Sequence, residues 1–167
     1  MSRDRPTFMH SRQSLLRARL ATIRRDLNEA IGRIGQDDLS WAPTLGMRTV
    51  SGQLVEIIIT EMQLISQLRD DRRIGDPTAI AMLGDTMDIE NLKTWSIRVR
   101  GETLEYLDSL SEEQLAEEIS FGVGWFGSMG LSTIPRAEVF LNIADHEWYH
   151  VGQLTSYLWA LGINPYR

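Results

Sequence analysis

Two of the three histidines in the chain, His146 and His150, are four positions apart. Residues at this spacing on an α-helix lie on the same face, one turn from each other. Two imidazoles so placed can bind the same ion, because neutral histidine nitrogens are common ligands of zinc and related metals. The pair therefore predicts a site for one divalent transition metal ion.

Other polar residues share this face of the predicted helix. At 100° per residue, Asn142, Tyr149, Gln153 and Tyr157 fall within about 60° of His146, on a helix that is otherwise apolar. The interior of a helix bundle disfavours unpaired polar groups. A metal ion with its water would satisfy them. The alternative is that both histidines are structural and only form hydrogen bonds with their neighbours.

The same segment also matches a peptidase motif. Residues 146–150 read H-E-W-Y-H, and in H-E-x-x-H zinc peptidases the glutamate is the general base. Those enzymes take a third ligand from further along the chain. No His, Asp or Glu follows His150, and Glu147 is turned about 100° away from His146, towards apolar residues. We therefore do not expect a peptidase.

The composition is that of an ordinary globular protein. The 167 residues suit one domain, residues 1–167, and 43% of them are hydrophobic. There is no cysteine, which excludes disulfides and thiolate ligands. The net charge of -6 argues against nucleic acid as a partner. No apolar run is long enough to cross a membrane, and no signal peptide is visible, so we expect a cytoplasmic protein.

Helical periodicity predicts the elements that would position the histidines. Apolar residues recur at spacings of three and four in four segments, which are 11–34, 50–68, 89–110 and 135–161. We expect Asp88 to cap the third helix, and Thr49 or Ser51 to cap the second. The second segment contains Ile57-Ile58-Ile59, a run that favours strands. The predicted fold class is all-α, a four-helix bundle with long connections between helices.

Two features leave alternatives open. Residues 121–130 hold four glycines among large apolar residues, which favours a loop or small hairpin over a helix. This segment either borders the pocket or only turns the chain. On the last helix, Trp148 and Trp159 cannot face the same core as Ile143. Either a homodimer covers them, or residues 111–134 do.

Short motifs in order along the chain resemble the DinB/YfiT-like family. The last helix carries His146-x-x-x-His150-x-Gly-Gln-Leu, followed by Gly162-x-x-Pro165. Upstream, Arg48-Thr-Val-Ser-Gly-Gln-Leu54 is similar to the start of that family's second helix. The resemblance implies a four-helix bundle, commonly dimeric. It implies a metal held by the histidine pair and one histidine of the second helix. Some members or close relatives are transferases or isomerases that use bacillithiol or mycothiol.

In this chain the position of that third histidine is Glu56. The resemblance therefore implies a metal site of Glu56, His146 and His150. Zinc or nickel would suit it, and manganese or iron(II) are alternatives. It also implies a thiol-dependent transferase. An acidic thiol would need a basic contact near the pocket, for which Arg48 and the arginines of the first helix are candidates. The alternative is a degenerate site, with Glu56 merely solvated, in a non-catalytic metal- or ligand-binding protein of a stress response.

Glu61 is a second acidic residue on the same predicted helix, in the middle of its apolar stripe. A buried carboxylate needs a partner. Three partners are open from the sequence: the metal ion, a ligand histidine, or an arginine of the first helix. We prefer Glu56 as the ligand and expect Glu61 beside the site or in an ion pair.

Overall fold

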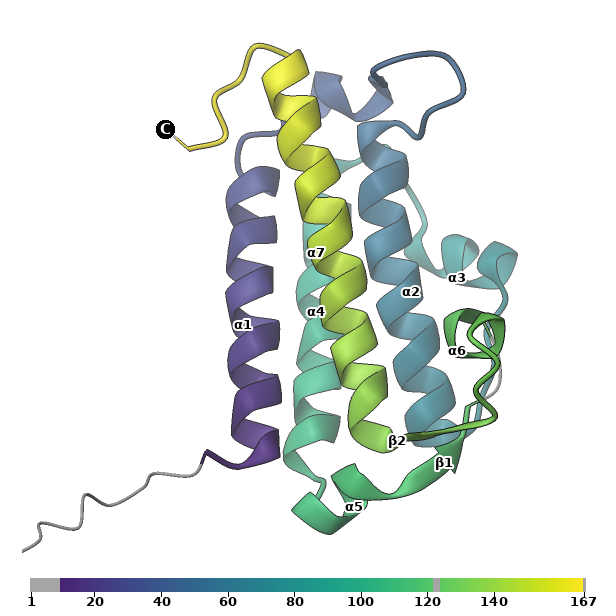
Figure 1. The fold of residues 1–167 in the computed structure, drawn as a ribbon. Coiled ribbons are helices and arrows are strands. Elements are labelled where there is room, and N and C mark those ends of the chain that lie inside the picture. Colours follow the sequence, from purple (N-terminus) through teal and green to yellow (C-terminus); the bar gives the residue numbers. More distant parts are fainter. Residues whose placement is uncertain (1–9, 122–123, 167) are drawn as a thin grey trace, which may run out of the picture.

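Four long helices run side by side and form the body of the protein (Figure 1). The computed structural model describes residues 10–121 and 124–166. The long helices are α1 (Arg12–Ile31), α2 (Val50–Asp70), α4 (Ile89–Asp108) and α7 (Arg136–Ala160). The predicted all-α class is confirmed, and each predicted helix forms close to its expected bounds.

The long helices run up, down, down and up in chain order (Figure 1). Helix α7 packs against α1 and α2, and α4 packs against the same two helices from the other side. The connection 71–88 carries the chain from one end of the bundle to the other and contains α3 (Asp76–Leu83). Because α2 and α7 are antiparallel neighbours, residues early in α2 lie beside residues late in α7.

Side-chain caps begin three of these helices, and the caps of α2 and α4 are at residues expected from the sequence. Ser11 accepts a hydrogen bond from the backbone of Ser14, Thr49 from Gly52, and Asp88 from Glu90. Such caps satisfy backbone donors that have no partner within the helix. Of the two caps considered for α2, the structure has Thr49.

The β-prone run in α2 is helical because all three of its side chains are buried. Ile57, Ile58 and Ile59 are only 2%, 3% and 4% exposed. Packing of this kind outweighs a propensity difference of a few tenths of a kcal/mol per residue.

The apolar core is divided into two clusters along the bundle axis. One contains Leu27 of α1 and Leu154 of α7, and the other contains Leu20 and Phe140 of the same helices. Both use residues from all four long helices. On α1, α4 and α7, a buried charged residue described below lies in the sequence interval between the two clusters, whereas on α2 it lies between Ile59 and Met62 of the first cluster.

The connection between α4 and α7 holds small elements: α5 (Glu112–Ala116), β1 (Glu118–Ser120), α6 (Gly124–Ser128) and β2 (Thr133–Pro135). The two strands pair antiparallel, with Ile119 opposite Ile134. The expected hairpin is thus present at its base, but α6 corrects the expectation that 121–130 contains no helix. One helical turn lets Phe126 reach the core, where it is 5% exposed and contacts Phe121. Residues 122–123 of that segment lie outside the described residues.

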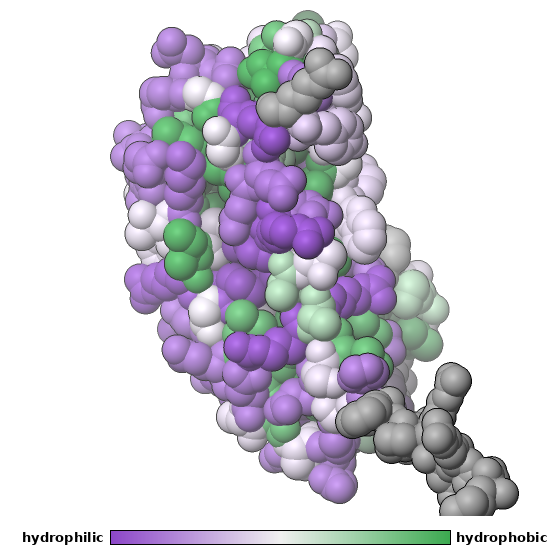
Figure 2. Space-filling model, turned by 90° about the vertical axis from the view of Figure 1, so that its left-hand side faces the viewer, coloured by the Kyte–Doolittle hydropathy of each residue, from purple (hydrophilic) through white to green (hydrophobic). Residues whose placement is uncertain are grey.

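Helix α3 was not expected from the sequence, and a 3₁₀ helix, Gln36–Ser40, follows α1. Both are short. Among the described residues, none of the helices is apolar over enough length to cross a membrane. The side of the molecule that α1 occupies is mainly hydrophilic, with only scattered hydrophobic residues (Figure 2).

Candidate metal centre

The two histidines of α7 face each other across one helical turn. Their Nε2 atoms are 3.2 Å apart and their ring centroids 4.5 Å apart. Two ligands of one tetrahedral zinc ion, each at about 2.0–2.1 Å from it, are separated by about 3.3 Å. The spacing of the two Nε2 atoms therefore fits a shared metal ion.

A hydrogen-bond chain from α2 orients His150. Its Nδ1 lies 2.5 Å from Gln53 Oε1, and the amide nitrogen of Gln53 donates to Tyr157 Oη at 3.0 Å. Tyr157 in turn donates to the backbone oxygen of Arg48 at 3.0 Å. Because the Gln53 oxygen accepts from Nδ1–H, the lone pair of His150 is on Nε2, the atom that faces Nε2 of His146. Such support is typical of metal-binding histidines.

Glu56 completes a group of three potential ligands. One ligand atom from each of Glu56, His146 and His150 lies within 4.8 Å of the other two. Glu56 projects from α2, three residues after Gln53, so one helix provides both a carboxylate and the residue that orients His150. The Glu56 side chain also forms an ion pair with Arg48, whose Nη2 is 3.2 Å from Oε2.

The histidines are held in the neutral form that binds metals. Burial lowers the pKa of His146 to about 4, and the charge of Arg48 contributes in the same direction. Burial also lowers the pKa of His150 to about 4, helped by His146. Both imidazoles are therefore uncharged near pH 7, with lone pairs available to an ion.

A cavity of about 620 Å³ opens beside these three residues. Asn142 and Tyr149, expected near the site, line it together with Arg48 and Asp145. Gln153 does not line the cavity, but it lies beside His150, where its side chain acts to raise the pKa of that histidine, and its amide nitrogen donates to Tyr149 Oη at 3.0 Å. The cavity has the size of many small-molecule sites. Arg48, one of the basic residues considered from the sequence, lies at the cavity wall.

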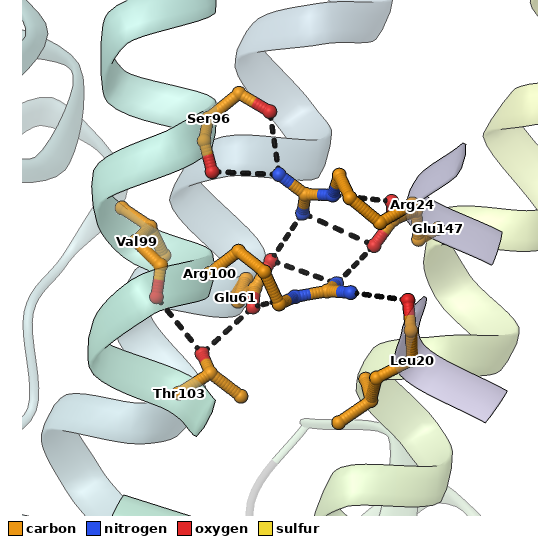
Figure 3. Close-up of polar contacts among 8 residues, drawn as sticks. All are labelled: Leu20, Arg24, Glu61, Ser96, Val99, Arg100, Thr103 and Glu147. Carbon is orange, nitrogen blue, oxygen red and sulfur yellow. Dashed lines mark hydrogen bonds and ion pairs between the residues drawn. The ribbon is translucent and has the colours of Figure 1, made fainter. Parts of the chain in front are cut away.

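Glu61 is absent from this group because it belongs to a buried ionic cluster (Figure 3). Its carboxylate lies 2.7 Å from Arg24 Nη2 of α1 and 2.7 Å from Arg100 Nε of α4. Of the three partners open from the sequence, the structure selects the first-helix arginine and adds one from α4. Burial works to raise the pKa of Glu61, but Arg100 and Arg24 outweigh it and hold the pKa below its ordinary value.

Glu147 is the fourth member of the ionic cluster. Arg24 Nε donates to its Oε1 at 2.8 Å, and Arg100 binds its Oε2. Both oxygens of the glutamate in the H-E-x-x-H segment are therefore held by guanidinium groups. The four residues come one from each long helix, and each is at most 8% exposed. With two charges of each sign, the cluster is neutral.

Further partners satisfy the remaining donors and acceptors of the cluster. Arg24 Nη1 donates to the backbone oxygen and to Oγ of Ser96, at 2.6 Å each. Arg100 Nη1 donates to the backbone oxygen of Leu20 at 2.8 Å, and Thr103 Oγ1 donates to Glu61. Complete pairing of this kind is what makes buried charges tolerable.

The reading of the sequence did not identify a polar stripe on α2. Glu56, Thr60, Gln63 and Gln67 follow one another at spacings of four, three and four, and the last three line a second cavity next to the first. The same helical count that found the stripe on α7 would have found this one. Gln53 gave no such signal, because its role depends on how α2 and α7 are aligned.

The structure thus defines a class of protein: a helical bundle with a two-histidine, one-carboxylate group between antiparallel neighbouring helices. The chain belongs to the DinB superfamily, whose family model matches residues 19–154. No curated protein shows significant sequence similarity to it.

Two crystal structures share this fold. A DinB-like protein from Bacillus subtilis, YjoA, is 17% identical, with a TM-score of 0.63 over 89% of this chain and 92% of that one. A DinB-like protein from Bacillus cereus ATCC 10987 is 14% identical, with a TM-score of 0.64 over 89% of this chain and 93% of that one. At these identities the likeness concerns the fold alone.

Proposed function

We propose that the protein binds one divalent transition metal ion through Glu56, His146 and His150. The observation that carries this proposal is that the three ligand atoms lie within 4.8 Å of one another, with the lone pair of His150 aimed by Gln53. Two imidazoles and a carboxylate suit zinc or nickel, and also manganese or iron(II). Three protein ligands leave at least one coordination position for water or a substrate.

We further propose that a small thiol is the molecule activated there. A bound metal ion would lower the pKa of a thiol and hold it as the thiolate nucleophile of a transfer reaction. The chain's own contribution is placement. Arg48 at the cavity wall would attract an acidic thiol, and Asn142 and Tyr149 offer hydrogen bonds to its polar groups. The carboxylate ligand makes the ion less electrophilic than three histidines would.

A specific contact favours a second candidate, a non-catalytic metal- or ligand-binding protein. The Arg48–Glu56 ion pair already neutralises the carboxylate, at 3.2 Å. A metal ion must compete with this guanidinium, which weakens binding. In this case the cavity would hold a ligand without activating it. Addition of metal to the protein with a chromogenic thiol separates the candidates, because only the first predicts a metal-dependent fall in the thiol pKa.

The first test is the metal content of the purified full-length chain, measured by elemental mass spectrometry after reconstitution with zinc, nickel or manganese. About one equivalent is expected in the wild type. His146→Ala and Glu56→Ala should lose it. Asp145→Asn is the matched control for Glu56, because it removes an acidic group from the same cavity but outside the proposed ligand set. No metal in the wild type, or equal loss in the control, would contradict the proposed site.

We also propose that the protein is a homodimer. Trp148 and Trp159 on the outer face of α7 are 54% and 53% exposed in the single chain. The connection between α4 and α7 therefore leaves them uncovered, although its Phe126 and Ile134 pack with the first turns of α7. Exposed tryptophans on one helix face are typical of a surface that a partner covers. A second copy of the chain would cover both.

A further inference from the structure

A second cavity, of about 360 Å³, lies next to the proposed metal centre. Asn142 and His146 line both cavities, so the two spaces meet at the histidine whose Nε2 faces the proposed ion. The metal centre and the second cavity together form one elongated site between α2 and α7. An ion at the histidines would lie at the junction of two compartments.

The polar stripe of α2 gives the direction of this site. Glu56 lies at the metal centre, and Thr60 and Gln67 line the second cavity. At 1.5 Å per residue, Glu56 and Gln67 are about 16 Å apart along the helix axis. On antiparallel α7, Asn142 lies one turn before His146, in the same direction. The second cavity therefore extends from the metal centre towards the C-terminal end of α2.

The walls of the second cavity are mostly apolar. Leu64 and Ile74 contribute aliphatic groups, and Phe121 and Phe126 contribute aromatic rings 6.0 Å apart. Both phenylalanines are almost fully buried, at 3% and 5% exposed. Surfaces of this kind favour a flat or apolar molecular body over a hydrophilic one.

One cationic group borders this apolar space. Arg73, in the connection after α2, lines the cavity and is exposed, and it forms no ion pair within 10–121 and 124–166. Other arginines nearby are engaged: Arg69 pairs with Asp70, and Arg72 donates to Ser66 Oγ at 3.3 Å. A guanidinium without an anionic partner at the edge of an apolar cavity is suited to a carboxylate.

We propose that the second cavity binds the acceptor substrate, a small molecule with an aromatic or apolar body and a carboxylate that reaches Arg73. Its reactive part would lie at His146, where the two cavities meet. The proposal rests on the proposed function, since it gives that metal centre a second substrate of defined chemistry. The thiol would occupy the cavity lined by Arg48, and the acceptor the one lined by Phe126.

The test uses 4-phenylbutyrate as the probe and its uncharged amide, 4-phenylbutanamide, as the matched control ligand. Their affinities are measured by isothermal titration calorimetry on the full-length protein, both zinc-loaded and metal-free. We expect saturable binding of both, with the carboxylate about three- to fivefold tighter, as an exposed charge contact allows. We expect this preference with and without zinc, because Arg73 rather than the ion provides it.

Two variants and a control locate the probe. Arg73→Gln should remove the preference for the carboxylate, whereas Arg72→Gln, a neighbouring exposed arginine outside the cavity lining, should keep it. Leu64→Trp should fill the cavity and weaken both ligands at least about tenfold, while a thermal melt verifies that the variant is folded.

The outcomes separate this inference from the metal proposal. A protein that holds one zinc but binds neither ligand overturns the inference and leaves the metal centre standing. Binding that requires zinc and is unchanged in Arg73→Gln means that the carboxylate is on the ion, which also overturns it. A protein that takes up no zinc on reconstitution, but still prefers the carboxylate through Arg73, supports the cavity and refutes the metal centre.

Discussion

Glu147→Gln should be among the most destabilising conservative substitutions in this chain. The change keeps the shape of the side chain but removes one of the two negative charges of the ionic cluster. Arg24 Nε at 2.8 Å and Arg24 Nη2 at 3.1 Å would then face an amide with one acceptor oxygen, and Arg100 would lose its partner on this side. An excess positive charge would remain in a site at most 8% exposed.

The size of the effect follows from that imbalance. Removing one partner of a buried ion pair costs about 3–5 kcal/mol. For a chain of this length, each kcal/mol lowers Tm by roughly 2–4 °C. Urea unfolding monitored by circular dichroism measures the free energy directly. The control is Asp108→Asn, which breaks the Arg17–Asp108 pair, whose side chains are each 50% exposed. That change should cost less than about 1 kcal/mol.

A double variant tests the reasoning about charge balance. Arg24→Met with Glu147→Gln leaves Glu61 and Arg100 as a neutral pair, so the double variant should be more stable than the sum of the single losses predicts. A coupling free energy above about 1 kcal/mol is expected. If Glu147→Gln costs no more than the surface control, or if the two losses simply add, the account of the cluster as one charge-balanced unit is wrong.

Three further predictions concern the site, the pH dependence of stability and the assembly. Gln53→Ala should weaken zinc binding about 10- to 100-fold without removing a ligand, measured by competition with a chelator; unchanged affinity would mean that the orientation of His150 does not matter. Because the pKa of folded Glu61 lies below its ordinary value of 4.5, the unfolded chain takes up this proton first as pH falls. The contribution of Glu61 to the free energy of unfolding should therefore be present at pH 7 and diminish below about pH 5. Urea melts across this pH range measure it. Any pH dependence of stability that persists in Glu61→Gln comes from other groups. Gly152 lies on the outer face of α7, with open space where a side chain would begin, so Gly152→Glu should leave the single chain folded but separate a dimer. Light scattering that gives a dimer for both proteins would place the interface elsewhere.

Sequence periodicity predicted the parts of this structure that depend on local spacing. The long helices, their caps and the facing pair His146 and His150 all follow from residues within a few turns of one another. The position of Glu56 next to that pair depends on how α2 is aligned with α7, which no local pattern encodes. It came from a family resemblance, and its role as a ligand remains a prediction.

Partner choice inside the core was harder to predict. The position of Glu61 on an apolar stripe showed that its carboxylate needed a partner, but three candidate partners remained. Helical periodicity does not say which residues of the other helices lie at the same height along the bundle. The same limit hid the role of Glu147. Short elements such as α3 and α6 were missed since one or two turns carry too little periodicity to separate from a loop.

The ionic cluster also restricts how the bundle can move. Sliding one long helix past its neighbours by a single turn, 5.4 Å, would carry its charged residue into one of the apolar clusters and leave the other three unbalanced. Shear between helices, a common way for helical proteins to change shape, is therefore costly here. The relative heights of Glu56 and the two histidines should stay constant, and ligands must reach the metal centre through rearrangements of side chains and connecting segments.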